Sequence, residues 1–189
     1  MPRYFIGLSV TFHDPAIAIL NDQGEVLFAE ATERYLQHKR ALNCPADTLY
    51  YLTRLFTEHC PSPEQITVAF NWNTHRPWYE SISARLGFLS APGLLRTGIK
   101  KLRSPLENYQ LHHMMASQHT RILDAGVNLV RIIREHFPAC QVSFKDYDHH
   151  LTHAAMACYS SPFEETACAI VDSYGEHGAM AFYHYQDRK

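Results

Sequence analysis

Three histidines stand close together in the segment DHHLTHAAMACY, residues 148–159. His149 and His153 are four residues apart, so on a helix their side chains would lie on one face. Two imidazoles at this spacing are one way in which proteins bind a divalent metal ion. A solvent-exposed helix end that is rich in histidine is the alternative, because the chain contains 13 histidines. The spacing alone leaves both interpretations open.

Two loops offer further polar side chains. The loop TFHDP, residues 11–15, has no glycine and places His13 beside Asp14, which favours side-chain chemistry. An exposed turn at Asp14 is the alternative. The loop DSYGEHG, residues 172–178, contains Gly175 and Gly178. Small, flexible residues allow backbone N–H groups to surround an anion, so this second loop is a candidate phosphate-binding turn.

Hydrophobic runs bounded by turn residues predict most elements of the chain. The expected strands are residues 4–10, 16–20, 26–31, 66–71, 141–147, 167–171 and 179–185, and the first three form an antiparallel meander. The expected helices are residues 44–56, 107–137 and 149–159. The long helix has an expected apolar stripe of Ile122, Val127, Val130, Ile133 and Phe137. Residues 72–105, which hold both tryptophans, are expected to be a variable surface insertion.

Bulk composition excludes several classes of protein. The formal net charge of −2 gives no general attraction to nucleic acid. The five cysteines are scattered and never occur as CxxC, which predicts free thiols in a reducing compartment. No apolar run reaches the length of a transmembrane helix, and the amino-terminal apolar run is too short for a signal peptide. We therefore expect a cytoplasmic protein without a membrane partner.

The order of elements suggests an α/β fold. A strand, a polar loop and a second strand open the chain, and the same unit recurs at residues 167–185. This repeat and the order βββ-α-β-α-β-α-ββ fit the actin-like ATPase architecture, in which two ribonuclease-H-like halves face one cleft. We expect a first half with a mixed sheet and helices at residues 1–160. The first hairpin of a second half would occupy residues 161–189.

Four segments resemble the amino-terminal part of the O-carbamoyltransferases, which modify antibiotics and nodulation factors and are relatives of tRNA threonylcarbamoyl-transfer enzymes. They read GLSVTFHDPAIAIL, ATERYLQHK, DHHLTHAAMACYSSPFEE and AIVDSYGE. The resemblance implies that a separate carboxy-terminal domain makes carbamoyl-adenylate from carbamoyl phosphate and ATP. The actin-like domain would then pass the carbamoyl group to a hydroxyl of a small-molecule acceptor. It implies a divalent metal, with Fe²⁺ expected and Mn²⁺ or Zn²⁺ as alternatives.

The same resemblance assigns roles to particular residues. It implies that His149, His153 and Asp172 bind the metal, and that His13, oriented by Asp14, takes the proton of the acceptor hydroxyl. The residues implied in substrate or nucleotide binding are Glu33, Arg34, Lys39, His150, Gly175 and Glu176. For the charged residues that follow the third strand, a solvated surface is the alternative interpretation. Ser173 and Tyr174 stand where the family has smaller residues, which crowds the second loop.

The chain ends soon after the second strand of the expected second half, which predicts an amino-terminal fragment without the adenylate-forming domain. We expect this fragment to be inactive alone. Its last hairpin would leave Met180, Phe182 and Tyr185 without a core, so we expect the chain either to self-associate through this hairpin or to leave it mobile. A non-catalytic module that binds a nucleotide or a metal is one alternative function. A protein similar to the tRNA threonylcarbamoyl-transfer enzymes is the other.

Overall fold

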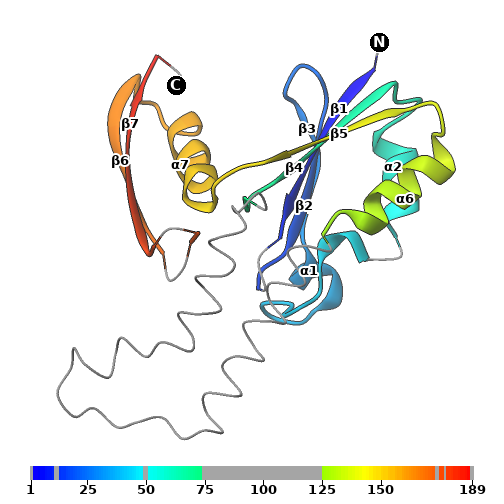
Figure 1. Cartoon of the computed structure of the whole chain (residues 1–189), viewed down its shortest axis with the longest axis horizontal. Coiled ribbons are helices and arrows are strands. Elements are labelled where there is room, and N and C mark those ends of the chain that lie inside the picture. The colour runs from blue at the N-terminus through cyan, green and yellow to red at the C-terminus, as the bar shows by residue number, and fades with distance from the viewer. Residues whose placement is uncertain are drawn as a thin grey trace, which may run out of the picture.

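The computed structural model describes residues 2–10, 13–48, 51–73, 125–172, 175–176 and 178–187. The elements and their bounds are β1 (Arg3–Ser9), β2 (Ala16–Leu20), β3 (Val26–Ala31), α1 (Thr32–Leu36), the 3₁₀ turn η1 (Ala46–Thr48), α2 (Leu52–His59), β4 (Gln65–Phe70), α6 (Val127–His136), β5 (Gln141–Asp146), α7 (His149–Tyr159), β6 (Glu165–Val171) and β7 (Met180–Gln186). Figure 1 shows their arrangement.

The strands form two sheets within the described residues. The larger sheet has the order β3-β2-β1-β4-β5. Its first three strands are antiparallel, whereas β4 runs parallel to β1 and β5 runs parallel to β4. This confirms the expected mixed α/β sheet and is compatible with a ribonuclease-H-like first half. The antiparallel pair β6–β7 forms the second sheet.

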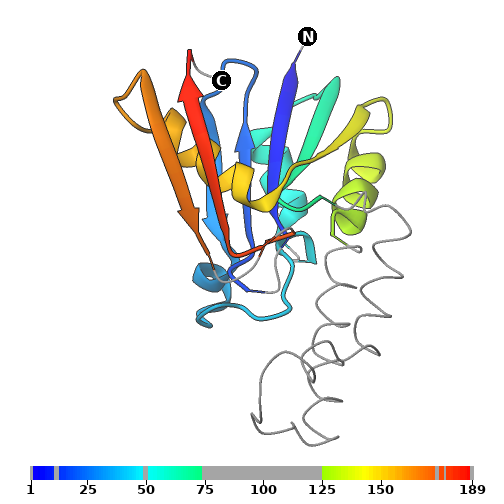
Figure 2. The ribbon, with the colours of Figure 1, turned by 60° about the vertical axis from the view of Figure 1, so that its left-hand side comes forward.

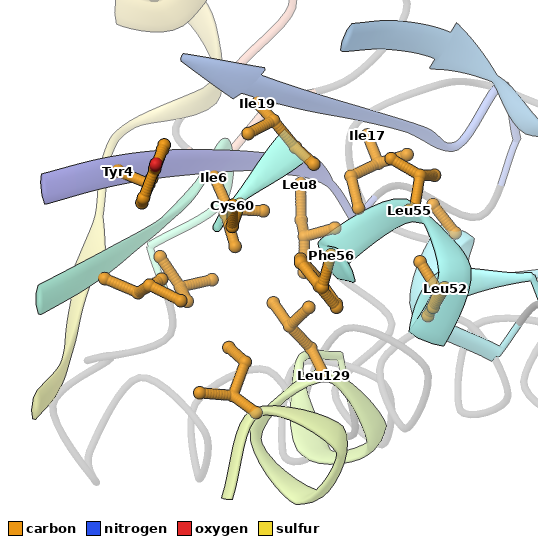
Figure 3. Close-up of a cluster of buried hydrophobic side chains, with 14 of the residues drawn as sticks. Tyr4, Ile6, Leu8, Ile17, Ile19, Leu52, Leu55, Phe56, Cys60 and Leu129 are labelled. Atoms are coloured by element: carbon orange, nitrogen blue, oxygen red, sulfur yellow. The ribbon is translucent and has the colours of Figure 1, made fainter. Parts of the chain in front are cut away.

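The core lies between the five-stranded sheet and the helices α2 and α6, which cover one of its faces (Figure 1). Alternate residues of β1 and β2 point into it, as a strand with one covered face requires. In α2 the buried residues are Leu52, Leu55 and Phe56, and their spacing of three and four residues places them on one stripe. Figure 3 shows these side chains in one cluster with Ile6, Leu8, Ile17 and Leu129.

The expected helix at residues 44–56 differs from the structure. A 3₁₀ turn occupies Ala46–Thr48, and α2 begins only at Leu52 and continues to His59. Residues 49–50 lie outside the described part. The short helix α1 was not expected, because its five residues give too little periodicity to recognise. It follows β3 directly, and its Thr32 is buried.

The expected long helix is wrong at residues 125–126, which form a turn. Gly126 has a φ of 85°, in the left-handed region that glycine adopts readily, and α6 starts after it. The expected stripe is also partly wrong, since Val127 is exposed and the unexpected Leu129 is fully buried beside Ile133. Residues 107–124, including Ile122, lie outside the described part of the chain.

Helix α7 lies between the two sheets (Figures 1 and 2) and packs against β6 and β7. Tyr185 of β7 is buried and its ring meets Tyr159 edge-on at 5.8 Å, so the expectation that Tyr185 lacks a core is wrong. On the opposite side of this sheet Val171, Met180 and Phe182 are 75%, 62% and 76% exposed. We call this side the outer face. The expected boundary between a first half at residues 1–160 and the start of a second half at residues 161–189 stays a prediction.

Candidate metal centre

The polar residues of interest follow the carboxyl ends of three parallel strands. β1, β4 and β5 are neighbours in the sheet and run in the same direction. The loop with His13 follows β1, Asn71 follows β4, and α7 begins shortly after β5. Because ligands of α/β proteins bind outside the carboxyl ends of such strands, this edge is the place to look for a site.

His149, His153 and Asp172 converge at this edge. The Nε2 atom of His149 lies 3.0 Å from Oδ2 of Asp172 and 3.2 Å from Nε2 of His153. His153 Nε2 lies 3.5 Å from the same carboxylate oxygen. One potential ligand atom from each residue falls within 4.8 Å of the others. His149 is buried, whereas the His153 side chain is 48% exposed. The cluster is therefore enclosed by protein at His149 and open to solvent at His153.

The start of α7 is fixed by its own sequence. Asp148 precedes the helix, and its Oδ1 accepts a hydrogen bond of 2.9 Å from the backbone N–H of Leu151. This is the usual role of an aspartate at a helix N-cap. The hydroxyl of Tyr183 on β7 donates to the same oxygen at 3.3 Å. The helix therefore begins at His149, and its first turn is held against the second sheet.

Two residues that sequence reasoning missed surround the His149 ring. Nδ1 of His149 lies 3.3 Å from the backbone oxygen of Asn71, which suits an Nδ1–H donor. Trp72 is buried, with its ring 5.2 Å from that of His149, so it is wrong to place this residue in a surface insertion. The remainder of that segment, from residue 74 on, lies outside the described part. Asn71 could have been found from the sequence, because it is a polar residue directly after a predicted parallel strand.

Asn71 also connects this ring to the loop after β1. Its Oδ1 accepts a hydrogen bond of 2.8 Å from the backbone N–H of Val10, and its Nδ2 donates to Ser9 Oγ at 3.3 Å. The donor at Val10 fixes which end of the amide carries oxygen. Asn71 thus joins the end of β1, three residues before His13, to the first residue of α7.

His13 and Asp14 form the expected pair. His13 Nδ1 lies 2.7 Å from Asp14 Oδ2, and the Asp14 backbone N–H donates to the oxygen of Arg40 at 2.8 Å. Asp14 has a φ of 51°, which an aspartate tolerates better than most residues. The pair therefore has the geometry of an imidazole oriented by a carboxylate.

Of the charged residues after β3, Glu33 takes part in a local hydrogen bond, whereas Arg34 and Lys39 are exposed. Glu33 Oε2 accepts a hydrogen bond of 3.0 Å from the backbone N–H of Arg40, so this carboxylate shapes the local turn. Arg34 lies 3.6 Å from Glu33, and its side chain is 77% exposed. Lys39 is exposed as well. No contact brings these residues to the histidine cluster within the described residues, and their substrate role stays a prediction.

His150, Gly175 and Glu176 meet at the start of α7. His150 is 3% exposed, and among the described residues its Nε2 has no hydrogen-bond partner. A Cβ added to Gly175 would lie 2.6 Å from the His150 ring, so only glycine fits there. The Gly175 N–H donates to the oxygen of Gly178 at 2.8 Å and is therefore engaged within its own loop. The Glu176 carboxylate accepts bonds from backbone N–H groups.

The donor set fits a divalent metal ion. Two imidazoles and one carboxylate suit Fe²⁺, Mn²⁺ or Zn²⁺ and leave coordination positions open. Burial and the neighbouring His149 lower the pKa of His153, although Asp172 opposes this shift. A lower pKa favours the neutral imidazole, which is the form that binds metal. The contact from His149 Nδ1 to a backbone oxygen is the outer contact that metal-binding histidines usually make.

Fold and cluster together define an α/β protein with a candidate His–His–Asp metal centre at the carboxyl ends of its parallel strands. A family model described as carbamoyltransferase N-terminus matches residues 4–189 of this chain. The chain therefore belongs to the carbamoyltransferases, in agreement with the resemblance of its sequence motifs. A search of curated proteins finds no significant match. Among the described residues, no helix combines the length and the apolar character needed to cross a membrane.

Proposed function

We propose that this protein takes part in metal-assisted transfer of a carbamoyl group to a hydroxyl of a small-molecule acceptor. The observation that carries the proposal is the convergence of His149, His153 and Asp172 in a chain that belongs to the carbamoyltransferases. The donor would be carbamoyl-adenylate, made from carbamoyl phosphate and ATP by a separate domain. The family model describes only an amino-terminal part, which supports this division of labour.

In this proposal Fe²⁺ is the expected metal, with Mn²⁺ and Zn²⁺ as alternatives. When bound, such an ion supplies Lewis-acid stabilisation of negative charge on phosphate and carbamoyl oxygens. His149 would offer Nε2, because its Nδ1 faces the backbone oxygen of Asn71. His153 would offer Nε2 from the open side, and Asp172 would reduce the net charge of the site.

His13 and Asp14 would handle the proton of the acceptor. The acceptor hydroxyl oxygen forms a bond to the carbamoyl carbon, and the bond between that carbon and the adenylate oxygen breaks. AMP leaves with the electron pair. With Nδ1 of His13 on Asp14, its Nε2 is the nitrogen that would take the hydroxyl proton. Asp14 orients the ring and stabilises the imidazolium that results.

The remaining predicted contacts complete the proposal. Arg34 and Lys39 are exposed cations that follow β3 and would approach phosphate groups or a carboxylate of the acceptor. By resemblance, the acceptor would be a small molecule such as an antibiotic or a nodulation factor. Five free thiols support a reducing compartment, so we propose a cytoplasmic location.

Metal binding tests the proposal directly. The chain is loaded with Fe²⁺ under anaerobic conditions, and its metal content and its affinity for AMP are measured with and without the metal. We expect metal-dependent AMP binding that His149→Ala combined with His153→Ala abolishes. The matched control is His184→Ala, which removes an imidazole that is 62% exposed on β7. A double variant that keeps the metal and AMP binding of the parent would contradict the proposal.

The same preparation separates the alternative functions. A tRNA-directed enzyme would bind tRNA as its acceptor, whereas this proposal expects no tRNA binding. A non-catalytic module would bind nucleotide equally well with and without the metal. Either result would replace carbamoyl transfer to a small molecule as the preferred function.

A further inference from the structure

Glu176 makes contacts that differ from those of a substrate ligand. Its Oε1 accepts a hydrogen bond of 2.7 Å from the backbone N–H of Asn73, just beyond β4. Its two carboxylate oxygens also lie 3.2 and 3.0 Å from the backbone N–H of His149, the first residue of α7. One side chain on the loop after β6 therefore binds two segments that are far apart in the sequence.

The contact with His149 is favourable for two physical reasons. The first N–H groups of a helix have no partner within the helix, so a carboxylate oxygen satisfies one of them. The amino terminus of a helix also carries a partial positive charge, which attracts an anion. Because the Glu176 carboxylate already occupies this position and is itself negative, a nucleotide phosphate would be repelled from it.

Gly175 strengthens the same docking. Its backbone lies so close to the ring of His150 that a Cβ would fall within 2.6 to 3.0 Å of three ring atoms. Gly175 is thus pressed against the second residue of α7, while Glu176 binds the first. Asp172, four residues before Glu176, directly follows β6. Its backbone N–H donates to the oxygen of Ala179 at 2.8 Å, and its Oδ2 lies 3.0 Å from His149 Nε2.

We propose that Glu176 is a positioning residue of the metal centre. By tying its loop to the end of β4 and to the start of α7, it sets the distance between Asp172 and the two histidines. This inference rests on the metal site of the proposed function and replaces the expectation that Glu176 binds nucleotide. Removing the carboxylate leaves all three metal ligands in the sequence but removes the contacts that hold the start of α7, which bears His149, to the residues that follow Asp172.

Cobalt substitution tests this role, because the visible spectrum of Co²⁺ reports its ligands. Glu176→Gln keeps the shape of the side chain but removes its charge. We expect its Co²⁺ affinity to fall by about 10–100-fold, the loss usual for residues that orient metal ligands. At saturating Co²⁺ the spectrum should shift toward that of Asp172→Ala, which lacks the carboxylate ligand. The matched control Glu165→Gln changes an exposed carboxylate on β6 and should behave as the parent.

The outcomes are distinguishable. If the parent binds Co²⁺ and Glu176→Gln matches its affinity and its spectrum, Glu176 does not position the site and this inference is overturned alone. A variant that is merely less stable but gives the parental Co²⁺ spectrum at saturation also overturns it. If the parent binds no Co²⁺, the metal site and the inference fail together. Far-UV circular dichroism of each variant verifies that it is folded.

Discussion

Asp148 provides the sharpest test of how the site helix is held in place. Its Oδ1 accepts from the Leu151 N–H at 2.9 Å and from the Tyr183 hydroxyl at 3.3 Å. Asp148→Ala removes both acceptor contacts at once. The first turn of α7, which contains His149, would lose its cap, and β7 would lose one hydrogen bond to the start of that helix.

The magnitude follows from these two contacts. Loss of an aspartate N-cap costs about 0.5–2 kcal/mol of folding stability. Loss of a neutral hydroxyl hydrogen bond costs about 0.5–1.5 kcal/mol. Because Asp148 is only partly buried, water can form hydrogen bonds with some of the groups that lose their partner. We therefore expect the free energy of unfolding to fall by about 1–2 kcal/mol in total. For a chain of 189 residues this corresponds to a decrease in Tm of about 2–8 °C.

Urea unfolding followed by far-UV circular dichroism measures this loss. Tyr183→Phe removes only the hydroxyl bond and should cost about 0.5–1 kcal/mol. Asp148→Asn keeps an acceptor at the N-cap and should remain close to the parent. The double variant Asp148→Ala, Tyr183→Phe should cost no more than Asp148→Ala alone, because the shared bond is already lost. Equal stability of Asp148→Ala and the parent, or additive losses in the double variant, would refute the reasoning.

Asp47→Ala should cost about 1–3 kcal/mol, because the buried Asp47 carboxylate accepts a 2.9 Å bond from Gly126 N–H at the start of α6; urea unfolding measures the loss. Burial raises the pKa of Asp47, so the free energy of unfolding of the parent should decrease as the pH rises through the folded-state pKa. Asp47→Asn has no proton to lose there, so its stability relative to the parent should increase with rising pH. Burial raises the pKa of Cys60 to about 12, so this thiol should remain protonated and unreactive. After iodoacetamide treatment, mass spectrometry should find Cys60 unmodified and the less buried Cys44 modified. Equal labelling of the two cysteines would contradict this. The parent should self-associate through the outer face of β6–β7, and Phe182→Ser should reduce the mass found by light scattering; a monomeric parent would exclude this.

Local patterns predicted the strands well. Strands β2 and β3 have the expected bounds, and the others differ by one or two residues, because alternating or continuous apolar runs specify a strand largely without help from the rest of the chain. The helix at residues 149–159 was also predictable, from the N-cap residue Asp148 and the apolar residues that follow. The break before α6 was harder, since glycine tolerates both helical and left-handed backbone. The contacts of Gly126 with Phe70 and with the Asp47 carboxylate come from distant parts of the sequence.

The sequence by itself determined the chemical types of the candidate site: an HxxxH pair on a helix, an aspartate after a strand and a His–Asp pair in a loop. Only the tertiary structure decided which of these meet. The 3.0 Å approach of Asp172 to His149 depends on how α7 packs on β6. The roles of Asn71, Trp72 and Glu176 arise from contacts across 27 to 103 positions of the sequence. Such contacts leave no local pattern, because they form only after the strand ends and the helix start have been brought to one edge of the sheet.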